Sequence, residues 1–124
     1  MAKYIVEVLE DRTDWRDFDS KKLHRIDGPA VEWANGNKSY WVNGKRHRID
    51  GPAIEWADGG KQYWVDGKLH RLDGPAVEYA NGHKSYWVDG KKLTEEEFLA
   101  RTTLKELTVA DIEKLLGYSV KVIK

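Results

Sequence analysis

One heptapeptide, His-Arg-x-Asp-Gly-Pro-Ala, occurs three times in this chain at a fixed interval of 23 residues, beginning at His24, His47 and His70. The full units are HRIDGPAVEWANGNKSYWVNGKR, HRIDGPAIEWADGGKQYWVDGKL and HRLDGPAVEYANGHKSYWVDGKK, which together span residues 24–92. A period of this length is typical of repeat proteins, in which each unit buries its apolar face against its neighbours. The chain has 124 residues, so we expect one folded domain rather than two independent cores.

Each unit is predicted to form two short antiparallel strands. In the first unit, residues 30–34 contain β-branched and aromatic side chains, and residues 38–42 form a second such run. Asn35-Gly36 lies between them and is a strong hairpin signal, because type I′ turns need positive φ at both central residues. A second turn signal ends each unit, at Asn43-Gly44, Asp66-Gly67 and Asp89-Gly90. The predicted fold class is mainly β (α+β): an antiparallel β-meander repeat array of three 23-residue hairpin units.

Alternation along the strands predicts which residues share a face. If Asn35-Gly36 is a two-residue turn, Trp33 pairs with Lys38 and Val31 pairs with Tyr40. We then expect a core face with Val31, Trp33, Tyr40 and Val42, and a partly solvated face with Ala30, Glu32 and Trp41. A turn one residue longer would change this pairing.

The two ends depart from the repeat, as caps of an array must. Residues 1–23 are predicted to be an N-terminal cap, with a strand over Tyr4–Leu9 and a degenerate half-repeat over residues 14–23. In this half-repeat Phe18 takes the position of Trp41. Residues 93–124 are predicted to be a helix–helix–strand cap. Thr94 and Glu97 form a capping box, with Phe98 and Leu99 facing the sheet. A second helix then ends before Gly117, and the chain closes with a strand over Tyr118–Ile123.

Composition excludes several classes of protein. Lys plus Arg and Asp plus Glu are both 21, and a formal net charge of zero argues against an extended nucleic acid or an anionic membrane as the partner. The absence of cysteine excludes disulfide scaffolds, thiol catalysis and cysteine zinc sites. Glu7 interrupts the apolar N-terminus, and no apolar stretch approaches the ~20 residues of a membrane span. We therefore expect a soluble cytoplasmic protein.

The pattern Tyr40-Trp41-Val-Asn-Gly44-Lys-Arg-His47, continued by Gly51 and Gly59, resembles the MORN repeat and its variants. In those repeats a Tyr- or Trp-bearing strand, a glycine turn, a histidine and further glycines recur about every 23 residues. The resemblance covers residues 24–92, although Arg25 and Asp27-Gly28-Pro29-Ala30 replace the usual glycine-rich turn. The dense His-Arg-x-Asp-Gly-Pro-Ala form also resembles small bacteriophage and bacterial proteins. This resemblance implies scaffolding or binding to proteins, and sometimes to lipids, rather than catalysis.

Three histidines at a fixed period raise the question of a metal site. With two strands per unit, equivalent residues lie ~10 Å apart, from ~4.8 Å per strand. The ligands of one zinc ion must all reach it at ~2.0–2.1 Å. We therefore predict that His24, His47 and His70 form a structural ladder, with no metal site and no cofactor. His83 lies off this period and is expected to be an exposed turn residue.

The arginine row and the tryptophan row each allow two interpretations. Arg25, Arg48 and Arg71 stand two residues before Asp27, Asp50 and Asp73, so they could brace successive turns, with Glu32, Glu55 and Glu78 as further partners. They could also grip a phosphate beside stacked bases. Trp41, Trp64 and Trp87 could form a buried spine, or an exposed strip that marks a partner site.

Catalysis is not expected, because the reactive residue types recur in identical copies and no catalytic motif is present. The predicted function is non-catalytic binding by a phage or bacterial accessory factor that neutralises a host component. The partner would be a host defence protein or a small nucleotide-derived signal. The candidate binding residues are Trp41, Trp64, Trp87, Arg25, Arg48, Arg71, His47 and His70.

Two other functions stay open. A structural or assembly scaffold would form a homo-oligomer through its edge strands, Tyr4–Leu9 and Tyr118–Ile123. An enzyme that processes a nucleotide or glycan would need a unique cleft around an off-period residue such as His83.

Overall fold

The computed structural model describes residues 3–105 and shows a mainly β protein with one helix after the last repeat. The elements of this part of the chain are β1 (Tyr4–Val8), β2 (Arg12–Asp17), β3 (Val31–Trp33), β4 (Lys38–Ser39), β5 (Trp41–Val42), β6 (Lys45–Arg46), β7 (Ile54–Glu55), β8 (Lys61–Gln62), β9 (Trp64–Val65), β10 (Lys68–Leu69), β11 (Val77–Glu78), β12 (Lys84–Val88), β13 (Lys91–Leu93) and α1 (Glu95–Lys105). The predicted fold class is confirmed.

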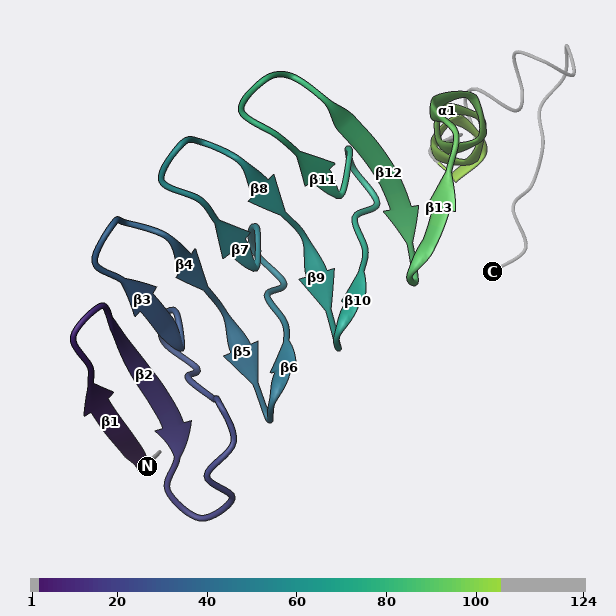
Figure 1. The fold of residues 1–124 in the computed structure, drawn as a ribbon. Helices are drawn as coiled ribbons and strands as arrows, with labels where there is room; N and C mark the ends of the chain where they lie inside the picture. The colour runs from purple at the N-terminus through teal and green to yellow at the C-terminus, as the bar shows by residue number, and fades with distance from the viewer. Residues whose placement is uncertain (1–2, 106–124) are drawn as a thin grey trace, which may run out of the picture.

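Nine strands form one antiparallel sheet in the order β1-β2-β3-β4-β7-β8-β11-β12-β13. Figure 1 shows these hairpins side by side, from the N-terminal pair to α1. β5 with β6 and β9 with β10 form two small sheets beside it. Backbone hydrogen bonds also join these small sheets, because Gly67 N donates to Arg46 O (2.8 Å) and Arg48 N donates to Trp64 O (3.0 Å). Successive units are therefore linked along both halves of the 23-residue repeat.

The first turn of each unit is one residue longer than predicted, and the predicted pairing is wrong. Val31 pairs with Ser39 rather than with Tyr40. Trp33 N donates to the main-chain oxygen of residue 37 (2.9 Å) around the loop 34–36, in which Gly36 alone has a positive φ, of 98°. A type I turn completed by a glycine bulge is the three-residue alternative to a type I′ hairpin. The second turn is as predicted, since both residues of Asn43-Gly44 have positive φ.

This one-residue shift changes which side chains share a face. Val31, Ser39 and Trp41 lie on one face, which we call the groove face. Tyr40 lies on the other, which we call the loop face because the repeat loops cross it. The predicted core face, with Val31 beside Tyr40, is therefore wrong.

Burial is concentrated in rows that run across the strands. Ala30, Ala53 and Ala76 have no exposed surface, and the following residues, Val31, Ile54 and Val77, are at most 9% exposed. The next row alternates in charge from strand to strand, through Glu32, Lys38, Glu55, Lys61, Glu78 and Lys84. Opposite charges on neighbouring strands stabilise their pairing.

The N-terminal cap is a hairpin of β1 and β2, which confirms the predicted strand near Tyr4. β2 then takes the place of a repeat's second strand, because Asp14 pairs with Val31 as Ser39 pairs with Ile54. The offset between β2 and the first repeat is thus 25 residues rather than 23.

The predicted position of Phe18 is wrong as a result of this offset. Arg16 occupies the place of Trp41, and Phe18 is exposed in the turn that follows β2. The physical reason is a longer turn. His24 N donates to Trp15 O, whereas the equivalent bond in the first repeat runs from His47 N to Tyr40 O, and the first pair is separated by two more residues than the second.

The helix α1 begins with the predicted capping box. Glu97 N donates to Thr94 Oγ1 (3.1 Å), and Thr94 N donates to Glu97 Oε1 (2.9 Å), which holds the pKa of Glu97 below its ordinary value. Phe98 is buried against Tyr86, with ring centroids 4.7 Å apart, as expected. Leu99 is exposed, so its predicted contact with the sheet is wrong.

The second helix predicted before Gly117 and the strand predicted over Tyr118–Ile123 lie outside the described residues. α1 itself is too short and too polar to cross a bilayer, and residues 3–105 contain no other helix.

Candidate functional site

The predicted binding residues fall on opposite faces of the sheet. Trp41 lines a groove on the groove face. Five others line two clefts on the loop face, namely Arg25, Arg48, Arg71, His47 and His70. The structure therefore does not bring the tryptophan row and the arginine row together on one surface.

The repeat arginines are held by the same contacts in each unit. The guanidinium of Arg48 lies 3.9 Å from the centroid of the Tyr40 ring. Its Nε donates to Asp50 Oδ1 (3.2 Å), and its Nη1 donates to Pro52 O (3.1 Å) and to Glu55 Oε1 (2.6 Å). This is the bracing arrangement that the Arg-x-Asp spacing predicted, with the glutamate as a further partner.

The other two arginines repeat this arrangement on different rings. Arg25 lies over Trp15 of β2 at 3.7 Å, and Arg71 lies over Tyr63 at 4.0 Å. A guanidinium stacked on an aromatic ring gains a cation–π interaction as well as its hydrogen bonds. The arginine ladder therefore joins each loop to the preceding strand.

Burial and charge shift the pKa values of Arg48 and Tyr40. Burial lowers the pKa of Arg48, but the hydrogen bonds to Glu55 and Asp50, together with charge interactions with Tyr40 and Glu55, outweigh burial, and the pKa is raised. Burial raises the pKa of Tyr40, and the charge of Arg48 offsets only part of this effect. Arg48 is therefore charged and Tyr40 neutral near neutral pH.

The repeat histidines cap turns of the following hairpin. Asp66 N donates to His47 Nδ1 (3.0 Å), and Asp89 N donates to His70 Nδ1 (3.0 Å). An acceptor at Nδ1 places the proton of the neutral ring on Nε2. Each histidine thus serves a separate turn, and the described residues contain no group of three or more His, Asp or Glu side chains arranged to hold a metal ion.

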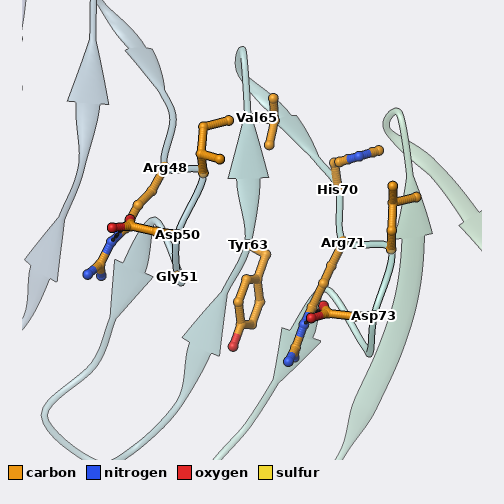
Figure 2. A pocket seen from close by; sticks show the side chains of 10 residues that line it. Arg48, Asp50, Gly51, Tyr63, Val65, His70, Arg71 and Asp73 are labelled. Carbon is orange, nitrogen blue, oxygen red and sulfur yellow. Dashed lines mark hydrogen bonds and ion pairs between the residues drawn. The ribbon is translucent and has the colours of Figure 1, made fainter.

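Two similar clefts separate successive repeat loops, and we call them the loop clefts. The first, of about 640 Å³, lies between the loops that begin at Arg25 and Arg48. The second, of about 550 Å³, lies between those that begin at Arg48 and Arg71. In Figure 2, Tyr63 stands in the second cleft between the Arg48 loop and the Arg71 loop. The clefts are thus one repeat apart and chemically alike.

The groove on the opposite face has a volume of about 520 Å³ and is rich in tryptophan. Its floor is apolar and well packed, since Val31 and Ile54 are at most 9% exposed. Three indole rings line it, from Trp33, Trp41 and Trp56. We call this site the Trp groove.

The first two units differ in the residue beside the aromatic walls of the Trp groove, which is Asn37 in one and Gly60 in the other. In the second unit, Trp56 covers Gly60, at which a Cβ would lie 2.5 Å from the ring, and stacks on Tyr79 with centroids 6.0 Å apart. In the first unit Asn37 replaces this glycine and lines the groove, and its Oδ1 accepts a hydrogen bond from Ala57 N (2.7 Å). The Trp33 and Trp56 rings border the groove, and no stack between them is found among the described residues.

Arg46 supplies a positive charge to this groove. Its guanidinium carbon lies 5.1 Å from the ring centroids of both Trp41 and Trp64. The equivalent residues of the neighbouring units are Leu23 and Leu69. Arg46 Nε is buried without a hydrogen-bond partner in the described part of the chain, where no carboxylate forms an ion pair with Arg46. A buried donor of this kind is costly unless a ligand or water satisfies it.

The charged side chains that line the Trp groove are mostly positive. Arg12 and Arg16 form ion pairs with Asp14, Asp11 and Glu7, and Lys38 pairs in register with Glu32 and Glu55. Arg46 is the lining cation that has no carboxylate partner among the described residues. Asp14 is almost fully buried and accepts a hydrogen bond from Arg12 Nε at 3.1 Å. The groove therefore favours an anion.

The tryptophan row is half-buried, which lies between the two predicted possibilities. The indole N–H of Trp41 donates to Ser39 Oγ (2.8 Å), and that of Trp64 donates to Gln62 Oε1 (2.8 Å). Trp87 is bound in the same way to Ser85. The rings are thus fixed in orientation by side chains two residues earlier on the same face.

Sequence reasoning missed the residues that make the Trp groove. Trp33 is predicted to lie on the core face, and neither Trp56 nor Arg46 is singled out by the sequence analysis, whereas all three line the groove. The signal that could have found Arg46 is its departure from Leu23 and Leu69 at the same position of the repeat. The corresponding signal at the wall of the groove is the change from Asn37 to Gly60 at the same position of the repeat.

No protein-family model, curated protein or solved structure matches this chain. The similarity to MORN-type repeats thus stays a prediction from spacing and turn residues, and the assignment of a function depends on the geometry of the two faces.

Proposed function

We propose that this protein binds a small anionic ligand with an aromatic ring, of the nucleotide class, in the Trp groove and holds it without chemical turnover. The observation that carries this proposal is Arg46, which lines the Trp groove between two indole rings and whose buried Nε has no hydrogen-bond partner among the described residues.

The walls of the groove suit a planar ring. Trp33 and Trp56 border a space above the apolar floor of Val31 and Ile54. Stacking of a base on an aromatic side chain contributes about 1–3 kcal/mol per base. A planar ligand ring bound beside Trp56 would extend the stack that Trp56 forms with Tyr79.

The cations of the groove suit a phosphate. Arg46 has unsatisfied hydrogen-bonding capacity at Nε, whereas Arg12 and Arg16 already contact Asp14. Arginine binds phosphate through paired, charge-assisted hydrogen bonds, which are stronger than neutral ones. Arg46 is therefore the residue that we expect to contact the anion.

Binding without turnover is supported by the chemistry of the lining residues. The carboxylate that lines the groove, Asp14, is held by Arg12 and is poorly placed to act as a general base. The repeat histidines lie on the loop face and cap turns.

The test uses the substitution that the repeat itself provides. Arg46→Leu installs the residue found at positions 23 and 69, so the fold is expected to tolerate it. The matched control is Lys92→Leu, which removes a cation at the equivalent position of β13, outside the groove. AMP, ATP and a cyclic dinucleotide would be titrated against the wild type by calorimetry and tryptophan fluorescence.

We expect at least one nucleotide to bind the wild type and Lys92→Leu equally, and to bind Arg46→Leu at least tenfold more weakly. A charge-assisted hydrogen bond of about 1.5–3 kcal/mol justifies that factor. Failure of all three nucleotides to bind at millimolar concentration, or equal binding to Arg46→Leu, would overturn the proposal.

We also propose that the protein neutralises a host component, because its His-Arg-x-Asp-Gly-Pro-Ala repeat resembles those of small phage and bacterial proteins. Native mass spectrometry of protein isolated gently from a bacterial lysate tests it. A retained mass of nucleotide size supports sequestration of a signal. A retained host protein instead supports direct inhibition of that protein.

Self-association as a scaffold is the second candidate, and the outer edge of β1 favours it. This strand pairs with β2 on one side, lies at the end of the sheet order and exposes Val6 and Val8. Exposed edge strands add strands from other chains. Light scattering should then show a dimer that Val6→Lys converts to a monomer, and a monomeric wild type would contradict this role.

A further inference from the structure

The fold accounts for every position of the His-Arg-x-Asp-Gly-Pro-Ala motif except the third. In the second unit, His47 caps a turn and Arg48 stacks on the Tyr40 ring. The Asp50 carboxylate and the Pro52 carbonyl both accept hydrogen bonds from Arg48. Gly51 leaves room for the guanidinium, and the alanine that ends the motif has no exposed surface. The residue between Arg48 and Asp50 has no such structural task.

This third position is aliphatic in all three copies although it is solvent-exposed. Ile26 is 66% exposed, Ile49 is 77% exposed and Leu72 is 42% exposed. A position that folding leaves free would tolerate polar residues, and exposed apolar residues at a regular spacing are typical of an interaction surface. We call the row of these three residues the aliphatic ridge.

An acidic residue follows each member of the aliphatic ridge. The side chains of Asp27, Asp50 and Asp73 are 76%, 87% and 87% exposed. The arginines that pair with them are only 18–24% exposed, so solvent meets the carboxylates rather than the guanidiniums. The ridge is therefore apolar with a negatively charged border.

We propose that the aliphatic ridge and the two loop clefts bind a basic amphipathic helix of a partner protein. This surface lies on the face opposite the Trp groove, so the proposal is independent of the nucleotide site. Lysine or arginine on the flank of the helix would pair with Asp27, Asp50 and Asp73, and its apolar stripe would cover the ridge.

The pitch of the array fits the pitch of a helix. Two strands per unit place equivalent points ~9.6 Å apart, and seven helical residues span ~10.5 Å. Apolar residues seven apart can therefore enter the first and second loop clefts, while the one between them lies on Ile49. The clefts, of about 640 and 550 Å³, are large enough for such side chains.

A second copy of this chain fits the ridge less well. Facing ridges would bring the exposed carboxylates of Asp27, Asp50 and Asp73 against their own copies, and like charges at an interface oppose association. The charge of the ridge thus selects a basic partner.

The experiment uses a designed peptide of three heptads with leucine at two positions per heptad and lysine or arginine at the flanking positions. Two control peptides have the same leucines out of heptad register, or glutamate in place of the basic residues. Binding to the full-length protein would be measured by fluorescence anisotropy, with helicity followed by circular dichroism. The protein variants are Ile49→Ser and the matched control Val8→Ser, which alters another exposed aliphatic residue, on β1.

We expect the basic heptad peptide to bind, to gain helicity, and to bind Ile49→Ser about tenfold or more weakly, because the serine variant lacks the apolar surface that Ile49 would bury under the helix. Val8→Ser and Arg46→Leu should leave its affinity unchanged. The proposal is overturned if the basic peptide does not bind, if either control peptide binds equally well, or if Ile49→Ser has no effect.

Discussion

The guanidinium carbon of Arg48 lies 3.0 Å from the point where Gly51 would carry a Cβ. Gly51 is not among the residues with positive φ, so packing rather than backbone conformation requires a glycine there. The same approach recurs at 2.9 Å between Gly28 and Arg25. The Arg and Gly of the repeat motif are therefore one structural unit.

Gly51→Ala is expected to lower the free energy of unfolding by about 1–2 kcal/mol, in the range of other overpacking substitutions. The added methyl group must displace Arg48 from its contacts with Tyr40 and Glu55. Urea denaturation of wild type and variant measures the change.

A double-mutant cycle tests whether Arg48 is the cause of this loss. With Arg48→Ala already present, Gly51→Ala should have little further effect, because the methyl group then has no guanidinium to displace. Additive losses would show that the glycine is needed for some other reason. Ile49→Ala, an exposed change in the same loop, serves as the control and should leave stability unchanged.

Arg46→Leu is expected to leave the free energy of unfolding unchanged or to raise it by up to about 1 kcal/mol. The variant removes a buried N–H that lacks a partner among the described residues, and it inserts the side chain that positions 23 and 69 carry. Chemical denaturation without ligand provides the measurement. A loss of more than about 1 kcal/mol would mean that the contacts of Arg46 with Trp41 and Trp64 hold the array together.

His47→Ala is expected to destabilise the protein by about 1 kcal/mol, because Asp66 N loses its acceptor. His47→Asn should lose less, since an asparagine carbonyl oxygen can accept a hydrogen bond as Nδ1 does. Thermal and urea unfolding of both variants, compared with His83→Ala at an exposed turn, provides the measurement. Equal losses for alanine and asparagine would contradict the capping role.

The repeat, the strands and the second turn could be predicted because each depends on local chemistry. Asn43-Gly44 has positive φ at both residues, as its sequence requires, and Thr94 with Glu97 forms the expected cap. The face assignment failed because the loop at Gly36 is one residue longer. Two- and three-residue hairpin loops carry similar Asn-Gly signals, and one residue reverses every side chain.

The Trp groove could not be predicted for a different reason. It arises where the units differ, at Arg46 and Asn37, whereas the prediction relied on what the units share. The arginine and histidine ladders are the shared features, and the structure gives both of them roles in bracing loops and capping turns. In a repeat protein, the departures from the repeat are thus the better guide to a unique site.

The pKa of Tyr40 is raised above its ordinary value of 10.0 chiefly by burial, and this predicts how stability changes in alkali. A raised pKa means that the folded state holds the phenolic proton after the unfolded chain has released its own. This contribution to stability is fully present below the unfolded pKa and is lost as pH rises through the folded pKa.

Tyr40→Phe removes that titration but keeps the ring beneath Arg48. In a spectrophotometric titration, the wild type should show one tyrosine that ionises at higher pH than an exposed tyrosine, and the variant should lack this signal. Its free energy of unfolding should also fall less steeply than that of the wild type once the pH exceeds about 10. Identical slopes for the two proteins would show that Tyr40 titrates normally and that burial beneath the Arg48 loop does not protect its proton.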